Sequence, residues 1–320
     1  MIRSLLCTLA LIFSAAVAHA EDTYPSRPIK IVLPFAAGGG TDTVARVLAQ
    51  QLTKQMGVSV VVENKAGANG NVGAEAASRA QPDGYTLLYN TSFIVTNPWL
   101  YQKLSYDPVA DFEPVLLIAK VPLVLVVHPS VPAKTLNEFI AYARANPGKL
   151  SYASSGIGGS THLANLLFQR AAGIDAVHVA YRGGGPALND VMAGAVQFYM
   201  DTVNTSLPQI KAGNVRALAV TSLNRLRDLP DVPTISETVQ PNFEVVSWQG
   251  LAVPAKTPPA IIVRLQQEFS RALKDPTVRE RLAAQSAEPV GSTTAEYISF
   301  LEQERALWGE TIRAAQVRLE

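Results

Sequence analysis

The sequence predicts an α/β protein with two domains, each built on a mostly parallel sheet that is flanked by helices. Short runs rich in β-branched residues alternate with segments of helical periodicity, a pattern typical of parallel sheets. This alternation begins again near Thr135, after a long extended apolar stretch. The chain of 320 residues is also long enough for two domains of ordinary size.

The first twenty residues are typical of a secretory signal. Arg3 supplies a positive start, residues 5–17 form an apolar run, and residues 18–20 (AHA) form a small-x-small cleavage motif. We expect cleavage after Ala20 and export to the periplasm. A retained anchor helix is the alternative, although the run is short for a bilayer. The only cysteine, Cys7, lies in this segment, so the mature chain is expected to lack disulfides.

The charge balance argues against some classes of partner. Without residues 1–20 the chain keeps 26 basic and 26 acidic residues, because Arg3 is the only charged residue removed. A net charge of zero gives no reason to expect a nucleic acid or an anionic membrane surface. No cluster of histidine and acidic residues has metal-ligand spacing, so no cofactor or metal is expected. A monomer is expected, since no coiled-coil pattern is evident.

The elements of the first domain follow in order. Residues 29–35 are rich in β-branched side chains and predict a buried strand. Residues 41–57 have apolar side chains at helical spacing and end at Gly57, which is typical of a helix C-terminus. Residues 58–64 and 85–92 predict two further strands, with a glycine-rich loop and a short helix between them.

A long apolar stretch, residues 112–129, predicts the first passage between the domains. Helices and strands alternate from Thr135 onward, and residues 215–222 predict a strand that leads back. Two crossings are what a hinge requires, because both must bend when the halves close on a ligand. The expected boundaries are residues 21–120 and 223–320 for domain 1, and residues 121–222 for domain 2.

Two similar corners lie 120 positions apart, one in each expected domain. Residues 38–42 (GGGTD) and 158–162 (GGSTH) each follow a predicted strand and open a predicted helix. The first N–H groups of a helix lack intrahelical partners, the helix dipole is positive there, and glycine lets a ligand approach the backbone closely. Because neither corner contains lysine or arginine, the pair predicts an anion site built from backbone donors.

Tight turns with ordinary helix caps are the alternative interpretation of these corners. Thr41, Ser160 and Thr161 could cap their helices or donate a hydroxyl to a ligand. Asp42 is an odd partner for an anion, and it could cap its helix or bind an amino group or a water. A third glycine-rich corner, within residues 181–190, leaves a ligand role and a simple turn equally open.

Two enzyme classes compete with an anion-binding protein. A nucleotide site is disfavoured because residues 38–42 lack the P-loop lysine and do not complete the pattern G-x-G-x-x-G. An exported serine hydrolase would use Ser154 or Ser155 as its nucleophile. His162 and Asp201 would complete the triad, although no G-x-S-x-G elbow surrounds these serines. The hydrolase stays open as an alternative, and so does a ligand sensor that feeds a signalling protein.

Several segments also resemble one known family. They include LPFAAGGGTDTVARVLAQQL (33–52), VVENKAGANGNVGAEAASRAQPDGYTLLY (61–89) and HVAYRGGGPALNDVMAG (178–194). The chain is similar, over essentially its whole mature length, to the Bug-type solute receptors of the tripartite tricarboxylate transporter systems. The resemblance implies a two-domain periplasmic binding fold, type II-like, that closes over a small carboxylate and delivers it to integral membrane permease subunits.

The resemblance further implies that two glycine-rich loops hold one ligand carboxylate, largely through backbone amides and ordered waters. Selectivity is expected from residues 90–97 and from Tyr181, so the identity of the carboxylate stays open. The family often has proline where this chain has Ala36 and Ala37. The candidate ligand-binding residues are Phe35, Ala37, Gly38, Gly39, Gly40, Thr41, Asp42, Asn90, Ser92, Ser154, Ser155, Gly156, Gly158, Thr161, His162, Tyr181 and Asp201.

Overall fold

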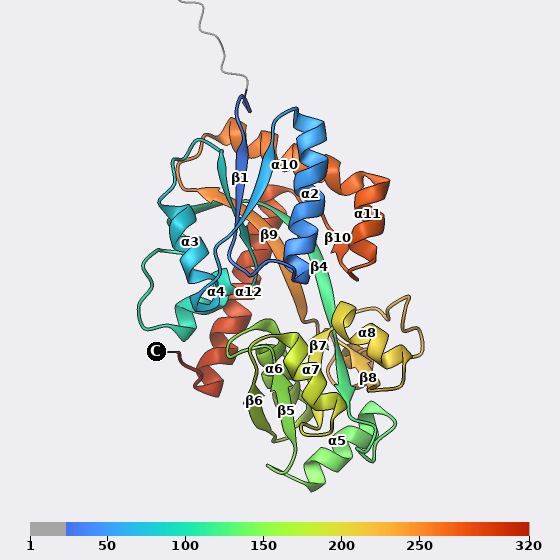
Figure 1. Cartoon of the computed structure of the whole chain (residues 1–320). Coiled ribbons are helices and arrows are strands. Elements are labelled where there is room, and N and C mark those ends of the chain that lie inside the picture. Colours follow the sequence, from blue (N-terminus) through green and yellow to red (C-terminus); the bar gives the residue numbers. More distant parts are fainter. Residues whose placement is uncertain (1–23, 320) are drawn as a thin grey trace, which may run out of the picture.

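The computed structural model describes residues 24–319. The predicted signal segment and its cleavage site after Ala20 lie outside these residues. Figure 1 shows two lobes joined by long strands that run from one lobe into the other. Helices packed on sheet in both lobes confirm the predicted α/β class.

One continuous sheet path connects the two lobes. Its strands are β1 (Ile29–Leu33), β2 (Val60–Asn64), β3 (Thr86–Asn90), β4 (Phe112–Val127), β5 (Ser151–Ser154), β6 (Val177–Ala180), β7 (Phe198–Thr202), β8 (Arg216–Val220), β9 (Val246–Pro254) and β10 (Glu288–Pro289). The order is β2-β1-β3-β9-β4-β7-β5-β6, with β8 and β10 also paired to β4. Pairing is parallel around β1 and β5. It is antiparallel between β4 and β9, because these strands carry the chain into the second lobe and back.

Helices cover the sheet in both lobes (Figure 1). The first lobe has α2 (Gly40–Met56), the 3₁₀ turn η1 (Ala68–Gly70), α3 (Asn71–Ser78), α4 (Phe93–Leu100), α10 (Pro259–Lys274) and α11 (Pro276–Ala283). The second lobe has α5 (Leu136–Ala145), α6 (Ser160–Ala172), α7 (Gly184–Met192), α8 (Val203–Lys211) and α9 (Ile235–Thr238). Within residues 24–319, no helix combines the length and apolarity needed to cross a bilayer.

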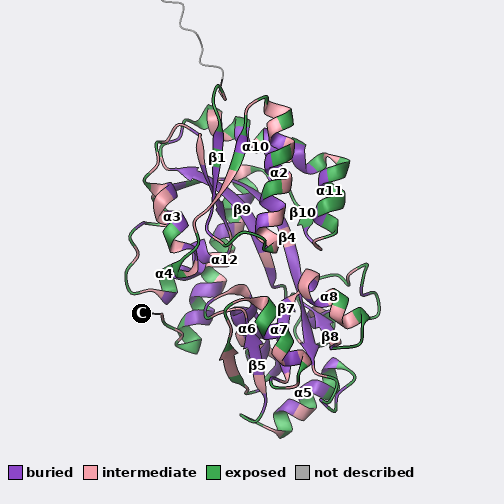
Figure 2. Cartoon of the chain, viewed as in Figure 1, coloured by how far each residue is buried: buried purple, intermediate pink, exposed green. Residues whose placement is uncertain are grey.

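Strand β4 is the central strand of the molecule. Its apolar run is almost entirely buried, as Figure 2 shows in purple, because helices or other strands cover both of its faces. Up to Pro122 it pairs with β9, and from Leu123 onward it pairs with β7. This change of partner at Pro122 and Leu123 marks the first crossing between the lobes, inside the stretch where the sequence predicts it.

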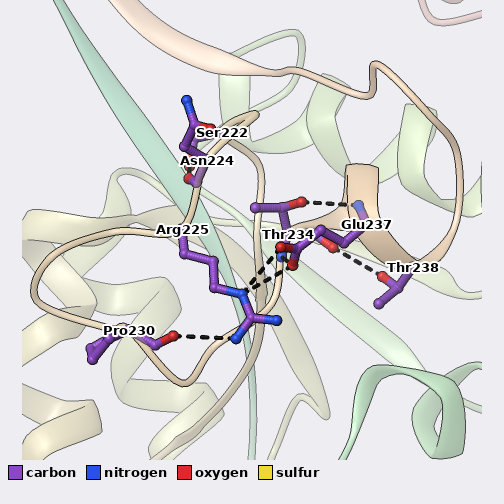
Figure 3. Close-up of polar contacts among 7 residues, drawn as sticks. All are labelled: Ser222, Asn224, Arg225, Pro230, Thr234, Glu237 and Thr238. Carbon is purple, nitrogen blue, oxygen red and sulfur yellow. Dashed lines mark hydrogen bonds and ion pairs between the residues drawn. The ribbon is translucent and has the colours of Figure 1, made fainter.

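The segment between β8 and β9 is held by a small polar network (Figure 3). The Arg225 guanidinium bonds the Glu237 carboxylate, with Nε 3.1 Å from Oε2. Thr234 and Glu237 form a reciprocal capping box at the start of α9. The Arg225 Nη1 group also donates to the Pro230 carbonyl oxygen. These bonds fix the path of the chain before it returns to the first lobe.

This segment also bears on where the second domain ends. Leu229 is buried in an apolar cluster with residues of β7 and α7, so the segment packs on the second lobe. The Val245 N–H donates to the Thr221 carbonyl oxygen, and Val246 then lies opposite Pro122 in the β4–β9 ladder. The boundary at residue 223 stays a prediction, and this packing favours a return to the first lobe near Val246.

The C-terminal helix α12 (Thr294–Ala315) contacts both lobes, since it packs against α4 and α6. Its Glu310 lies 2.9 Å from the Arg170 guanidinium of α6. The Glu304 carboxylate accepts two indole N–H groups, from Trp248 of β9 at 2.6 Å and from Trp308 at 2.8 Å. Helix α12 therefore bridges the two lobes and is also hydrogen-bonded to strand β9.

Gly250 of β9 lets Tyr297 and Asn90 pack closely against the backbone of the strand. A Cβ atom at this position would overlap the Tyr297 hydroxyl and come within 2.8 Å of Asn90 Oδ1. These two groups are themselves hydrogen-bonded at 2.7 Å. We expect Gly250→Ala to lower the free energy of unfolding by about 1–3 kcal/mol through overpacking, measured by urea denaturation. Gly185→Ala is the control, because a Cβ there meets no atom within 4 Å. Equal stability of the two variants would contradict the packing described.

Candidate ligand-binding site

A cavity of about 960 Å³ lies between the lobes and is lined by both. The first lobe contributes the loop after β1, the loop before α3 and the start of α4. The second lobe contributes the loop after β5, the loop after β6 and the end of β7. Because these loops follow the carboxyl ends of strands, the cavity lies where ligands bind in open α/β sheets.

The first glycine-rich corner forms one wall. Strand β1 ends at Leu33 and helix α2 begins at Gly40, close to the predicted bounds. Gly39 is the N-cap of α2 and supplies no side-chain cap, so the first N–H groups of the helix keep their capacity to donate. Phe35 and Thr41 line the cavity at this corner. The helix start therefore presents donors to the space between the lobes.

Asp42 lies behind this corner and holds its shape. Its carboxylate accepts the Gly38 N–H at 3.0 Å, the Arg46 Nε–H at 2.9 Å and the Asn64 amide at 2.9 Å. Burial opposes ionisation of this carboxyl, yet the bonds from these three donors outweigh it and lower its pKa to about 2. Arg46 is thus neutralised by Asp42 in the structure.

The second glycine-rich corner forms the facing wall. Strand β5 ends at Ser154, and α6 begins at Ser160 after the N-cap Gly159, which again supplies no side-chain cap. The Thr161 hydroxyl accepts the Ser155 N–H at 2.9 Å and lies 2.9 Å from the Ser155 hydroxyl. Ser155, Gly159 and Thr161 all line the cavity. Two helix starts of the same construction thus lie on opposite lobes.

A stacked pair of histidines supports the second corner from behind. The rings of His162 and His178 lie 4.0 Å apart at an interplanar angle of 13°. His162 Nδ1 accepts the Gly158 N–H at 3.1 Å, and His178 Nε2 lies 2.7 Å from the Ser154 hydroxyl. Burial, with a smaller effect from His178, lowers the pKa of His162 to about 3. A neutral His162 can therefore accept the loop N–H across the physiological pH range.

The serine, histidine and aspartate considered for a hydrolase are not joined in one network. The hydrogen bonds of the Ser155 side chain are with Thr161, and His162 is bonded to the Gly158 N–H. The Asp201 carboxylate accepts the Thr202 N–H at 2.8 Å and the Ser206 hydroxyl at 2.7 Å. Each of these side chains is therefore hydrogen-bonded to a neighbouring structural group, and none is bonded to another member of the proposed triad.

Tyr199 and Asp201 lie together on the second-lobe wall of the cavity. The Tyr199 hydroxyl is buried and has no hydrogen-bond partner among the described residues. A Cβ at Gly184 would lie 3.4 Å from this hydroxyl and 3.6 Å from Asp201 Oδ1. Burial raises the pKa of Asp201 to about 7, against hydrogen bonds that favour its ionised form. This wall therefore offers the Tyr199 hydroxyl, which makes no hydrogen bond of normal geometry, and beside it an acid that is easily protonated.

The cavity is lined by few charged side chains. Among the described residues that line it, Arg182 and Asp201 are the charged side chains. Arg182 is exposed, and Asp201 is buried. Attraction for an anion would therefore come from the helix starts and from hydroxyl groups, more than from a buried cation.

The structure divides the predicted site residues into two groups. Phe35, Ser92, Gly156 and Gly158 line the cavity together with Thr41, Ser155, Thr161 and Asp201, and Gly40 lines a small adjoining pocket. The others lie in or behind the walls: Ala37, Gly38 and Gly39 in the first loop, and Asp42, Asn90, Ser154, His162 and Tyr181 in hydrogen bonds to neighbouring protein groups.

Some lining residues were not predicted. The loop at residues 66–70 carries the sequence AGANG, and a positive φ at Gly67 and Gly70 lets it curve into the cavity. The glycine content of this loop was the sequence feature that could have indicated its place in the cavity wall. Tyr199 and Ser247 lie in or near strands and carry no local pattern that marks them as cavity residues. They reach the site through strand pairing between distant segments, of β7 with β4 and β5 and of β9 with β3 and β4.

Two α/β lobes with a ligand-sized cavity between them define the chain as a solute-binding protein of the periplasmic type. The model of the family described as "Tripartite tricarboxylate transporter family receptor" matches residues 44–317. The chain belongs to this family, which confirms the resemblance seen in the sequence.

Relatives of known structure share the whole fold. The Rhodopseudomonas palustris protein Rpa4515, solved with adipate, is 35% identical with a TM-score of 0.83 and covers 92% of this chain and 100% of its own. MatC from the same organism, solved with bound malate, is 33% identical with a TM-score of 0.78 and covers 90% and 100%. Protein BugT of Bordetella pertussis is 37% identical over 301 residues, covering 93% of this chain and 92% of BugT.

The buried acid of the cavity predicts a pH dependence of stability. The pKa of Asp201 is about 7 in the folded protein and near 3.8 when exposed, so the folded state holds its proton more tightly. Its contribution to stability is present below pH 4 and is lost as the pH rises through 7. We expect the stability of Asp201→Asn relative to the wild type to be about 2–3 kcal/mol greater at pH 8 than at pH 5. Urea denaturation at both pH values measures this, and a difference independent of pH would contradict the burial of an ionisable Asp201.

Proposed function

We propose that this protein captures a small organic carboxylate between its lobes and delivers it to a membrane permease. The observation that carries the proposal is the pair of uncapped helix starts, at Gly40 and Ser160, on facing walls of one cavity. Helix N-termini favour anions through unpaired N–H groups and the helix dipole. Family membership and the relatives solved with adipate and malate support the same class of ligand.

The strength of such a site is adequate for a receptor. A hydrogen bond to a charged group contributes about 1.5–3 kcal/mol, and a micromolar complex needs about 8 kcal/mol in total. Four or five backbone and hydroxyl donors therefore suffice after the cost of closure. We propose Thr41, Ser155, Thr161 and Tyr199 as the side chains nearest the bound carboxylate, with ordered waters completing the contacts. Asp42, Asn90, Ser154, His162 and Tyr181 would act by shaping the walls.

We propose that a site built from backbone donors binds its ligand without chemical turnover and then releases it to a partner. Backbone dipoles hold an anion reversibly, whereas a buried ion pair would be more costly to form and to break. We propose permease subunits as the partners and the periplasm as the location, with cleavage after Ala20. The hydrolase alternative has no support from the hydrogen bonds of Ser155 and His162.

A thermal-shift screen across mono-, di- and tricarboxylates tests the site. Ligand at 100 times its Kd should stabilise the protein by about 2.7 kcal/mol, which raises the Tm by several degrees. We expect Gly159→Leu to abolish the shift by filling the space beside Ser155. The backbone tolerates this side chain, since its Cβ would meet only ordinary contacts of 3.6 Å and 3.8 Å. Gly185→Leu, where no atom lies within 4 Å, is the control and should keep the shift. A full response in Gly159→Leu would remove the proposed site.

Removing the Tyr199 hydroxyl tests whether this group contributes to ligand binding or to the stability of the fold. We expect Tyr199→Phe to weaken carboxylate binding about 5–10-fold, because a donor to the charged ligand is lost. The free energy of unfolding should stay equal or rise, since the buried hydroxyl has no partner in the unliganded structure. Isothermal titration and urea denaturation measure the two quantities. A loss of stability with unchanged affinity would show that the hydroxyl serves the fold and not the ligand.

A further inference from the structure

A second, smaller pocket adjoins the main cavity on its hinge side. Its volume is about 140 Å³, and it shares four lining residues with the main cavity, among them Thr41 and Ser247. Helix α2 supplies Gly40 from the first lobe, α8 supplies Asn204 from the second, and the crossing strand β9 supplies Gln249. In Figure 1 the lower end of α2 faces α8 across the junction of the lobes. A group in this pocket would touch both lobes and the hinge.

The lining of this pocket is polar but carries no charge. It contains the amide side chains of Asn204, Gln249 and Gln285 together with four hydroxyl groups, and no charged residue among those described. A carboxylate moved from water into such a site would meet no cation, which makes its burial costly. An uncharged polar group can enter at much lower cost if its hydrogen bonds are satisfied. The lining therefore selects against a second charge.

The Asn204 side chain has hydrogen-bonding capacity that the protein does not use. Its Oδ1 atom is buried without a hydrogen-bond partner among residues 24–319. Its Nδ2 atom faces Gly40 and lies 3.1 Å from the place where a Cβ of that residue would stand. Gln249, in contrast, already accepts the Tyr89 hydroxyl at 2.5 Å. A primary amide can be matched by a hydroxyl or a carboxamide, which both donate and accept, whereas a carboxylate only accepts.

We infer that this pocket receives the far end of the bound acid, and that this end is an uncharged hydroxyl or carboxamide group. The inference rests on the proposed capture of a carboxylate at the two helix starts. At about 30 Å³ for each water-sized group, the pocket has room for roughly four non-hydrogen atoms, enough for a carboxamide and the carbon that bears it. Acids with one carboxylate and one uncharged polar end are then preferred over diacids of the same length.

Calorimetric titration of the full mature chain with matched acids tests the inference. The probes are the unbranched four-, five- and six-carbon diacids, their monoamides and the corresponding unsubstituted monoacids. At about pH 7.5 both carboxyls of the diacids are ionised. At the best chain length we expect the monoamide to bind about tenfold more tightly than the diacid, because two neutral hydrogen bonds replace a desolvated charge. We expect Asn204→Leu to reduce the affinity for the monoamide to that for the monoacid and to leave the monoacid unchanged.

The matched control is Asn214→Leu, an exposed asparagine just beyond the other end of α8, which should bind all three ligand types like the wild type. If no acid of any form binds the wild type, the proposed function itself fails. If acids bind but the diacid equals or exceeds the monoamide at every chain length, the function stands and the inference fails. The inference is also overturned if Asn204→Leu weakens the monoacid as much as the monoamide.

Discussion

Unpaired N–H groups at the starts of two helices are the feature on which the cavity depends. A side-chain cap would occupy one of them, and at both corners the N-cap is a glycine, Gly39 or Gly159, which supplies no such cap. Such corners follow the carboxyl ends of parallel strands, so the two half sheets must bring those ends together. The antiparallel crossing of β4 and β9 does this, because it joins the half sheets into one path without a long linker.

The charged and titratable groups near the corners serve to hold them in shape. Asp42 bonds Gly38 and neutralises Arg46, while the buried His162 stays neutral and accepts the Gly158 N–H. Each loop is therefore fixed by a group that does not itself face the cavity. Because these groups point away from the cavity, few charged side chains line it. An anion would therefore be attracted mainly by helix dipoles and hydroxyl groups.

The sequence predicted the α/β class and both corners, because these depend on local patterns of glycine, β-branched residues and helical spacing. The return crossing expected at residues 215–222 stays a prediction, and the packing of Leu229 on the second lobe favours a crossing near Val246. The sequence did not predict which way polar side chains turn at a corner. Asp42 and His162 each reach back four residues to a loop N–H, and the same spacing would allow them to face a ligand. Tyr199, Ser247 and Asn204 depend on contacts between distant segments, which single-sequence patterns do not record.

The position of the small amide pocket links selectivity to closure of the lobes. Gly40, Asn204 and Gln249 come from the first lobe, the second lobe and a crossing strand, so an occupant would contact all three at once. A ligand can favour the closed arrangement only by as much as it binds that arrangement more tightly than the open one. Contacts that form only when α2 and α8 face each other are absent from the open arrangement, so their whole free energy contributes to this difference in affinity. If the uncharged end of the acid occupies this pocket, its contacts would therefore add to the free energy by which the ligand favours the closed arrangement.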